Sequence, residues 1–171
     1  MKQRIMIGAI ILMAYLNLGA TNSLGEENKF SQFTLAGLKG VYLIVNEISL
    51  AIEREGLTKN LLKRAIKLKL RQADIRVLTE EELLFMPGKP CLYLSMHAVK
   101  NSEFSFYAYW TSLELRQLVR LERDKNIKVF AITWSVRSIG MLNVKELSKI
   151  RESVRELVDR FINAYFSVNP R

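Results

Sequence analysis

The spacing of apolar side chains predicts two long helices. The first follows Thr58, a natural N-cap, and the second follows Asn143, which has Glu146 three positions later and ends by Ser167, before Pro170. Apolar positions recur at helical spacing in the first helix at Leu61, Leu62, Ala65, Ile66, Leu68, Leu70 and Ala73. The second helix has heptad-spaced apolar residues at Leu147, Ile150, Val154, Leu157, Phe161 and Ala164.

Shorter elements are expected before the main sheet. Residues 41–45 form a continuous apolar run, which is typical of a strand buried on both faces in the middle of a sheet. Residues 75–78 predict a short second strand. Thr79 and Glu82 then have the spacing of a capping box, so a single helical turn through Phe85 is expected.

From residue 91 to residue 136 the hydrophobic period is two, which predicts three antiparallel strands. The first hairpin is expected at residues 100–103 with Asn101 and Ser102 as its loop, so that Lys100 faces Glu103. This register pairs Met96 with Tyr107, Leu94 with Tyr109, His97 with Phe106 and Tyr93 with Trp110.

The second of these strands, residues 104–123, would be about 65 Å long if straight. We therefore expect it to bend or break, at Thr111 and Ser112. A turn at residues 124–126 leads into the last strand, residues 127–136, in which both faces are apolar and the register stays open.

The alternation sorts the sheet into two faces. One face, expected to pack against the helices, carries Leu92, Leu94, Met96, Tyr107, Tyr109, Leu113, Leu115, Val119 and Leu121. The other face is apolar only near the first hairpin, at Tyr93, Val99, Phe104, Phe106 and Trp110. Further along it becomes a solvated surface of Glu114, Arg116, Arg120 and Glu122.

The predicted fold class is α+β: a two-layer sandwich with two long helices packed on one face of a mixed, mostly antiparallel sheet. The element order is β-α-β-β-β-β-α. Residues 39–171 form the single domain, and residues 21–38 form a polar leader before it.

Residues 1–20 have the pattern of a secretory signal, with Lys2 and Arg4 before an uncharged run from Ile5 to Leu16. An uncleaved N-terminal anchor and a buried core helix are the alternatives. No cysteine follows the apolar run, so lipidation there is not expected. The protein is predicted to be exported, to the periplasm or outside the cell.

The chain has 171 residues, and its formal net charge of +9 becomes +7 without Lys2 and Arg4. One cysteine and one histidine exclude an internal disulfide framework and leave little for a metal site, so no metal or other cofactor is expected. The single thiol, Cys91, is expected to be a small buried hydrophobe.

No catalytic motif is present. Cys91, Ser95 and His97 share one strand face, but residues two apart on a strand are about 7 Å apart, too far for a hydrogen bond. We read His97 as a cross-strand histidine stacked on Phe106, with a small hydrolase or transferase centred on His97 as the alternative. The acidic run at residues 80–82 is read as a helix-capping turn, not a cation site.

A basic ladder in the first helix is the first candidate binding feature. Lys59, Lys63, Lys67 and Arg71 are spaced by four, and like charges at this spacing disfavour a helix by about 0.2–0.5 kcal/mol per pair. The second helix instead places Glu146 near Lys149, Glu152 near Arg155 and Glu156 four before Arg160. The ladder is either a solvated face balanced by acids elsewhere or a surface for anionic lipid or lipopolysaccharide; export disfavours nucleic acid.

The second candidate feature is the aromatic cluster of Tyr93, Phe104, Phe106 and Trp110 on the face away from the helices. Residues 24–38 could fold back and cover it. Otherwise it would receive a protein partner, a second copy of the chain or a small apolar ligand.

The run Thr133-Trp134-Ser135 and the closing helix from Asp159 to Tyr165, together with the signal and the Tyr-rich meander, resemble a group of small exported bacterial proteins without an assigned function. At fold level the arrangement is similar to lipopolysaccharide-assembly lipoproteins and to the N-terminal domain of TolB. The chain departs from the lipoproteins because it lacks their lipidated cysteine.

We therefore expect a non-catalytic binding or envelope-assembly module that uses the aromatic sheet face or the basic helix. A structural protein that dimerises through its open sheet face is a further alternative. Any membrane association would be peripheral or through the N-terminal segment.

Overall fold

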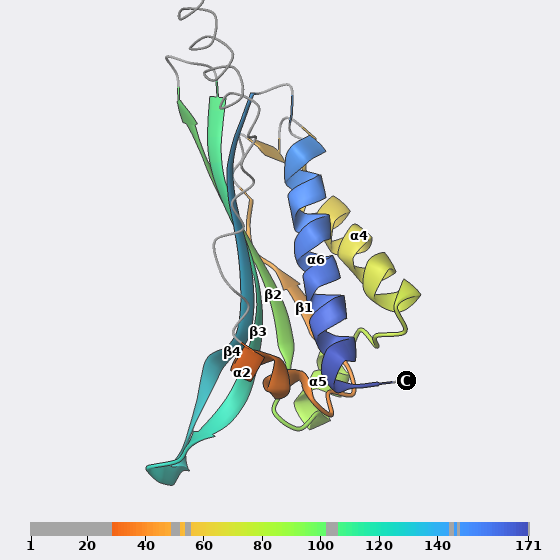
Figure 1. The fold of residues 1–171 in the computed structure, drawn as a ribbon, viewed down its shortest axis with the longest axis vertical. Coiled ribbons are helices and arrows are strands. Elements are labelled where there is room, and N and C mark those ends of the chain that lie inside the picture. Colours follow the sequence, from red (N-terminus) through yellow and green to blue (C-terminus); the bar gives the residue numbers. More distant parts are fainter. Residues whose placement is uncertain are drawn as a thin grey trace, which may run out of the picture.

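A four-stranded sheet organises the molecule (Figure 1). The structure is a computed structural model that describes residues 29–48, 52–53, 56–101, 106–143, 146 and 148–170. The strands lie in the order β1 (Tyr42–Val45), β2 (Cys91–Asn101), β3 (Phe106–Leu121) and β4 (Asp124–Asn143). β1 is parallel to β2, and the other pairs are antiparallel, so the sheet is mixed and mostly antiparallel.

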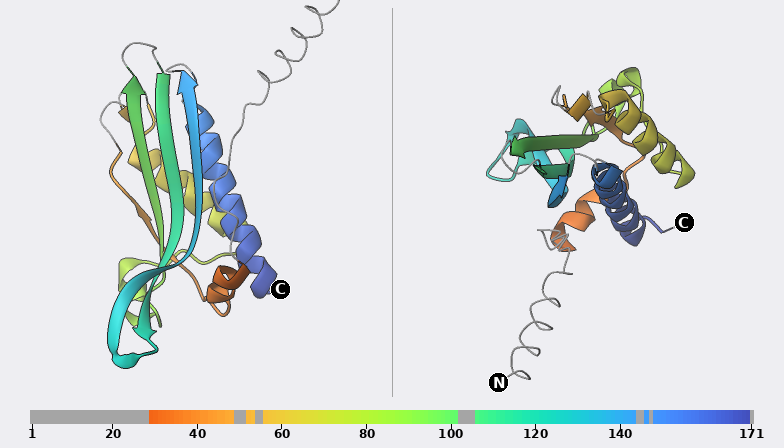
Figure 2. Two further views of the ribbon diagram at one scale, coloured as in Figure 1. Left: turned by 60° about the vertical axis from the view of Figure 1, so that its left-hand side comes forward. Right: turned by 90° about the horizontal axis from the view of Figure 1, so that it is seen from above.

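Two long helices, α4 (Lys59–Gln72) and α6 (Ser148–Val168), lie on one face of this sheet (Figures 1 and 2). Three short elements lie near one end of the sheet: α2 (Lys29–Gln32), the 3-10 helix η1 (Phe33–Leu35) and α5 (Glu80–Phe85). The fold class is α+β, as predicted.

Two of the predicted helix starts, at Thr58 and Thr79, are confirmed. The Thr58 hydroxyl accepts a hydrogen bond from the Leu61 N–H at the start of α4. Thr79 and Glu82 form the complete capping box of α5, with the Thr79 N–H donating to the Glu82 carboxylate. The start predicted for the second helix at Asn143 is wrong: Asn143 is the last residue of β4, and α6 begins at Ser148. The Asn143 N–H does donate to the Glu146 carboxylate, 3.2 Å away, before the helix begins.

The strand predicted at residues 75–78 is wrong. Only Val77 takes part, in an isolated parallel bridge to Val41, because Thr79 begins α5 two residues later. Consequently β1 is the outermost of the four strands, not a central one, and the bridge gives its outer edge two hydrogen bonds: Val41 N–H to Arg76 O and Leu78 N–H to Val41 O. The described part of the chain has four strands instead of the five predicted.

The predicted register of the first hairpin is wrong by four residues. Met96 pairs with Thr111, Leu94 with Leu113, His97 with Trp110 and Tyr93 with Glu114. Asn101 pairs with Phe106 inside the ladder, so it is not a loop residue, and Lys100 pairs with Tyr107; the predicted partner Glu103 lies outside the described residues. Because side chains alternate with a period of two, an even shift leaves every side chain on its predicted face.

The predicted core face is therefore correct for most of its length. The seven predicted residues from Leu92 to Leu115 are at most 5% exposed, whereas Val119 and Leu121 are only partly buried because they lie beyond the helices. Trp134, Val136 and Leu142 of β4 complete this face opposite Leu115, Leu113 and Tyr107.

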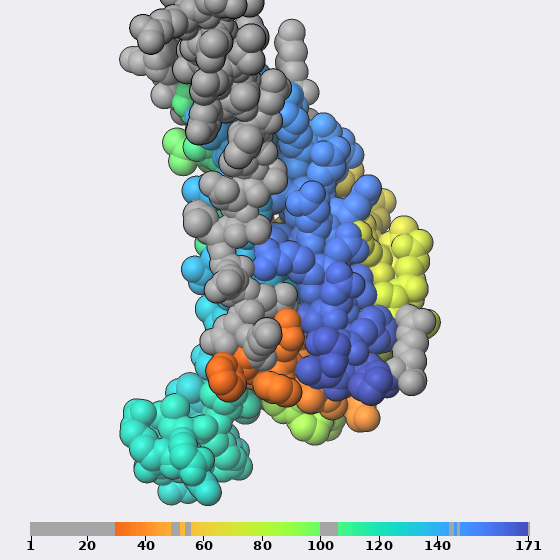
Figure 3. Space-filling view, viewed as in Figure 1, coloured from red at the N-terminus to blue at the C-terminus, as the bar shows by residue number. Residues whose placement is uncertain are grey.

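β3 bends at a different place from the one predicted. The ladder is regular through Thr111 and Ser112, and the register shifts between Leu115 and Arg116, where β4 has Thr133 as an extra residue. Such a bulge bends and twists a strand pair locally. Beyond it β3 and β4 continue as a ribbon that projects from the body (Figure 3).

Residues 33–38, predicted to lie in the leader, contribute to the packed domain. Leu35 is fully buried, and Leu38 packs against the core. Asn169, after α6, holds this segment by accepting a hydrogen bond from Gly37 N–H and donating one to Leu35 O.

Residues 1–28 lie outside the described residues, so the signal segment stays a prediction. No helix in the described ranges has the length and apolarity needed to span a membrane.

Candidate binding surfaces

The open sheet face is the face away from the two long helices. Its part next to the bulge carries a charged cluster over Tyr93 and is not a purely aromatic surface. The Arg116 guanidinium lies 3.8 Å from the centre of the Tyr93 ring. It also donates to one oxygen of the Glu114 carboxylate through Nε and Nη2, at 3.0 and 2.8 Å. Glu114 is only 5% exposed, so its prediction as a solvated residue is wrong: Arg116 and Ser112 satisfy it within the protein.

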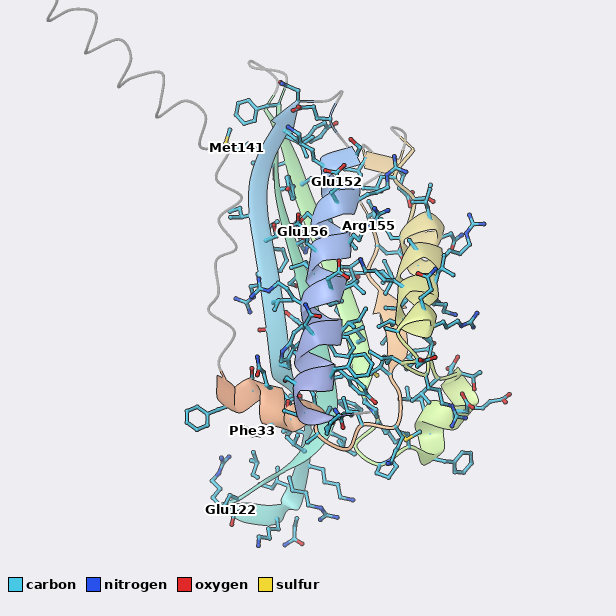
Figure 4. The ribbon with its side chains drawn as sticks, turned by 45° about the vertical axis from the view of Figure 1, so that its right-hand side comes forward. Phe33, Glu122, Met141, Glu152, Arg155 and Glu156 are labelled. Carbon is cyan, nitrogen blue, oxygen red and sulfur yellow. The ribbon has the colours of Figure 1, made fainter. Side chains whose placement is uncertain are left out.

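An apolar patch occupies the other part of the open sheet face, toward the hairpin between β2 and β3. Ile139 and Met141 of β4 lie next to Trp110 and Ala108 of β3, which lie next to His97 and Val99 of β2. Val99 and Met141 are 72% and 66% exposed, whereas Trp110 and Phe106 are partly buried. Figure 4 labels Met141 at this end of the sheet.

The predicted aromatic cluster is thus only partly assembled. Trp110 and Phe106 lie in the patch, Tyr93 lies apart from it beneath Arg116, and Phe104 lies outside the described residues. The patch stays a predicted partner surface, now with Val99, Ile139 and Met141.

The described part of the leader does not cover this patch. α2 and η1 contact β4 and α6, and the Thr34 hydroxyl donates to Thr133 O at the bulge. Tyr165 of α6 donates to Leu38 O. These contacts place residues 29–38 on the helix side of the sheet, with Phe30 and Phe33 exposed.

His97 stacks on Trp110 instead of Phe106, with ring centres 5.3 Å apart. It makes no hydrogen bond to Ser95, Cys91 or any other described residue. Cys91 is 8% exposed, and burial raises the pKa of its thiol, against a smaller opposing effect of Arg116. A thiol with a raised pKa is a weak nucleophile at neutral pH.

The basic ladder of α4 is partly neutralised. Residues four apart on a helix advance by about 40° around its axis. Lys59, Lys63 and Lys67 are accordingly partly buried, whereas Arg71, the last of the ladder, is exposed. Lys59 forms an ion pair with Glu47, a balancing acid from outside the helix. Lys63, Lys67 and Arg71 form no ion pair with any residue that the structure describes.

The acidic run of α5 is a helix cap, as predicted. Its third member, Glu82, also pairs with Arg76, and the hydrogen bond from the Thr79 backbone, helped by Arg76, lowers the pKa of the Glu82 carboxyl. Within the described ranges no group of three or more histidine, cysteine, aspartate or glutamate residues could hold a metal ion.

A groove with both apolar and cationic lining residues lies between α4 and α6. β1 and β4 run in the same direction, so the helices that follow them start at the same end of the sheet and run side by side. The groove has a volume of about 450 Å³. Its apolar lining comes from both helices: Leu61, Leu62, Ala65, Ile66, Leu68, Val154 and Val158.

The rim of the groove is cationic. Lys69 reaches across from α4 to Asp159 of α6, 2.6 Å away. Arg151 and Arg155 of α6 line the groove without an acidic partner among the described residues, and Figure 4 shows Arg155 on the side of α6 toward α4. The predicted pair of Glu152 with Arg155 does not form, whereas Glu146 and Lys149 pair at 2.7 Å as predicted.

Sequence reasoning did not find this groove. Arg151 and Arg155 are spaced by four, a signal present in the chain, but their place opposite α4 depends on how the two helices sit on the sheet. Leu68, predicted as part of the apolar face, is 59% exposed at the groove.

No protein-family model matches the chain, and the searches of curated proteins and of solved structures give no match either. The functional argument therefore rests on the geometry of the protein itself.

Proposed function

We propose that this protein is a non-catalytic binding module of the cell envelope, and that it holds an amphipathic anion in the groove between α4 and α6. The ligand class is a single acyl chain with a carboxylate or phosphate head. Export by residues 1–20 would bring the protein to membranes that contain such molecules.

One observation carries the proposal: two arginines that have no acidic partner among the described residues lie at the rim of an apolar groove. The floor is made by Leu62, Ile66, Val154 and Val158, none more than 3% exposed. The apolar surface open to an acyl chain comes from the more exposed lining residues Leu61, Ala65 and Leu68. Arginine presents a planar fork of donors that matches a carboxylate or a phosphate.

The surroundings favour a bound anion over a bound cation or a neutral chain. Asp159 is neutralised by Lys69, and no acidic residue of the described chain lines the groove, whereas Arg151 and Arg155 have no acidic partner among the described residues. An anionic head would gain two charge-assisted hydrogen bonds without displacing an ion pair of the protein.

Direct binding of palmitate and of a palmitoyl lysophosphatidic acid, measured by calorimetry below their micelle concentrations, tests the proposal. The two ligands share the chain and differ in the head, so they separate carboxylate from phosphate recognition. We expect saturable one-to-one binding, about tenfold weaker for each arginine changed, since a hydrogen bond to a charged group contributes about 1.5 kcal/mol.

Two variants and one matched control sharpen the test. Arg151→Gln with Arg155→Gln should weaken binding about a hundredfold, and Ala65→Phe, which fills the groove, should abolish it. Arg64→Gln with Arg71→Gln removes the same charge from the exposed side of α4 and should bind normally. Equal affinity in all four proteins, or no binding by the unchanged chain, would refute the proposal.

A further inference from the structure

The ribbon formed by β3 and β4 beyond the bulge is a second surface that the proposed groove does not use. β2 begins at Cys91 opposite Arg116, so residues 117–131, the distal ribbon, contain only two strands. Its root is held by hydrogen bonds from Leu118 N–H to Gly88 O and from the Gln117 amide to Thr34 O. Figures 1 and 3 show it standing clear of both long helices.

The distal ribbon and its root expose large apolar side chains. Phe130 is 58% exposed and Ile132, next to the ribbon at the bulge, is 49% exposed; Ile127 and Val129 are 40% and 38% exposed. A two-stranded hairpin is only marginally stable by itself in water. Exposed apolar residues concentrated on such a ribbon indicate that it meets a partner.

Two cationic residues, Arg120 and Lys128, lie on the face of the ribbon that carries Phe130. Phe130 pairs with Leu118, and one step toward the tip Lys128 pairs with Arg120, so two like charges lie directly opposite each other. This arrangement is unfavourable within the protein, and an anion would relieve it. Arg120 donates to Lys125 O, which holds it at the turn, and Lys128 has no acidic partner in the described chain.

Two acidic residues, Glu122 and Asp124, lie at the turn of the ribbon. Glu122 is at the tip, where Figure 4 labels it, and its side chain is 95% exposed, 3.9 Å from Lys125. The Asp124 carboxylate is engaged by the Asn126 N–H. An acid at the tip disfavours a tip-first approach to an anionic surface, whereas the face with Phe130, Arg120 and Lys128 has no acid.

We propose that the distal ribbon docks flat on an anionic lipid bilayer. Phe130, Leu118 and Ile132 enter the boundary between headgroups and acyl chains, and Arg120 and Lys128 reach lipid phosphates. The bilayer interface supplies apolar surface and phosphate side by side, in the arrangement that this face presents. A ribbon without a concave site suits such an extended surface better than a small ligand.

Co-sedimentation with vesicles tests the proposal. We expect the full chain to bind vesicles of phosphatidylcholine and phosphatidylglycerol in equal parts, more weakly at high salt, and to bind phosphatidylcholine vesicles poorly. Each cation near such a surface contributes about 1 kcal/mol, so Arg120→Gln with Lys128→Gln should weaken binding about thirtyfold.

Because the whole chain is basic, a control of equal charge is needed. Lys63→Gln with Lys67→Gln also removes two positive charges, from α4 instead of the ribbon, and should weaken binding much less. An equal or larger loss in this control would assign the binding to net charge or to the basic ladder and would overturn the proposal.

The apolar contact has its own pair of variants. Phe130→Ser should weaken vesicle binding, whereas Phe85→Ser, at an 88% exposed phenylalanine of α5, should not. Phe130→Trp should show a blue shift of the added fluorescence on anionic vesicles. An unshifted emission, or equal effects of the two serine variants, would contradict insertion of the ribbon.

The groove variant separates this proposal from the proposed function. Arg151→Gln with Arg155→Gln should lose the soluble ligand and still sediment with vesicles. If that variant loses vesicle binding while the ribbon variant keeps it, the ribbon proposal fails and the groove remains.

Discussion

Gly140 shows how a side chain of the neighbouring strand can limit which residue fits at one position. It pairs with Tyr109 across β3 and β4, and a Cβ built on it would lie 2.7 Å from the Tyr109 ring and hydroxyl. Tyr109 is 5% exposed, so its ring is confined by the core. The absence of a side chain at residue 140 is what lets this ring lie over the sheet.

We predict that Gly140→Ala destabilises the protein by about 1–3 kcal/mol, as overpacking does in a well-packed core. The loss of backbone freedom in the unfolded chain would favour alanine by only about 0.4–1 kcal/mol, so the clash decides the sign. Urea unfolding measures the effect. Tyr109→Leu introduced into Gly140→Ala should recover part of the loss, and a simple sum of the two single effects would contradict the steric cause.

Glu114 makes a related point for charge. The charged residues that alternate with apolar ones along this strand predict a solvated face that includes Glu114. In the structure Glu114 is instead buried and paired with Arg116, which lies over Tyr93. Arg116 and Tyr93 come from neighbouring strands, so this cluster could be recognised only after the register was known.

At the scale of elements, α5 is stabilised by its cap more than by burial, since none of its residues is buried. The Thr79 hydroxyl accepts from Glu82 N–H, and the Glu82 carboxylate accepts from Thr79 N–H. Thr79→Ala should cost about 1 kcal/mol and expose the α5 amides about fivefold more to hydrogen exchange, measured by NMR.

The cap should also respond to pH. The hydrogen bond from Thr79 and the pairing with Arg76 lower the pKa of Glu82 below its usual value of 4.5. A carboxyl with a lowered pKa in the folded state stabilises fully above the usual value and loses this effect as the pH falls through the lowered one. Protection of the Thr79 amide, corrected for intrinsic exchange, should therefore fall in that acidic range; Glu81→Gln should leave the transition unchanged.

The long helices and the meander belong to the same scale. Their existence follows from local spacing. The structure confirms the span of the first helix, the end of the second and most of the core face, whereas the second helix begins at Ser148 and not after Asn143. The register did not follow from the sequence, because the turn chemistry favoured a short loop at Asn101, whereas the longer ladder pairs Asn101 with Phe106. The even shift left the faces correct.

At the scale of the whole molecule, the segment before β1 is hydrogen-bonded to the end of α6 and to Asn169, which follows it. Leu35 is fully buried, Asn169 donates to its carbonyl at 2.9 Å, and Tyr165 donates to Leu38 O at 3.1 Å. This segment and the last turn of α6 therefore close the same end of the core.

Leu35→Ala should destabilise the protein by about 2–5 kcal/mol, through lost burial and the cavity left behind. Phe33→Ala, two residues earlier and at a 68% exposed side chain, should change stability by no more than about 0.5 kcal/mol. Urea unfolding of both variants makes the comparison. Similar small effects would show that the segment does not unfold together with the domain.

What the sequence determined by itself is local: the two helices, the caps at Thr58 and Thr79, and the sorting of strand residues into two faces. These depend on period and on neighbours within a few residues, so they can be recognised in the chain. Tertiary structure alone decided the register, the place of the bulge, the burial of Glu114 and Leu35, and the groove lined by Arg155. Each depends on residues far apart in the chain, whose meeting is set by how helices and strands pack and not by their own patterns.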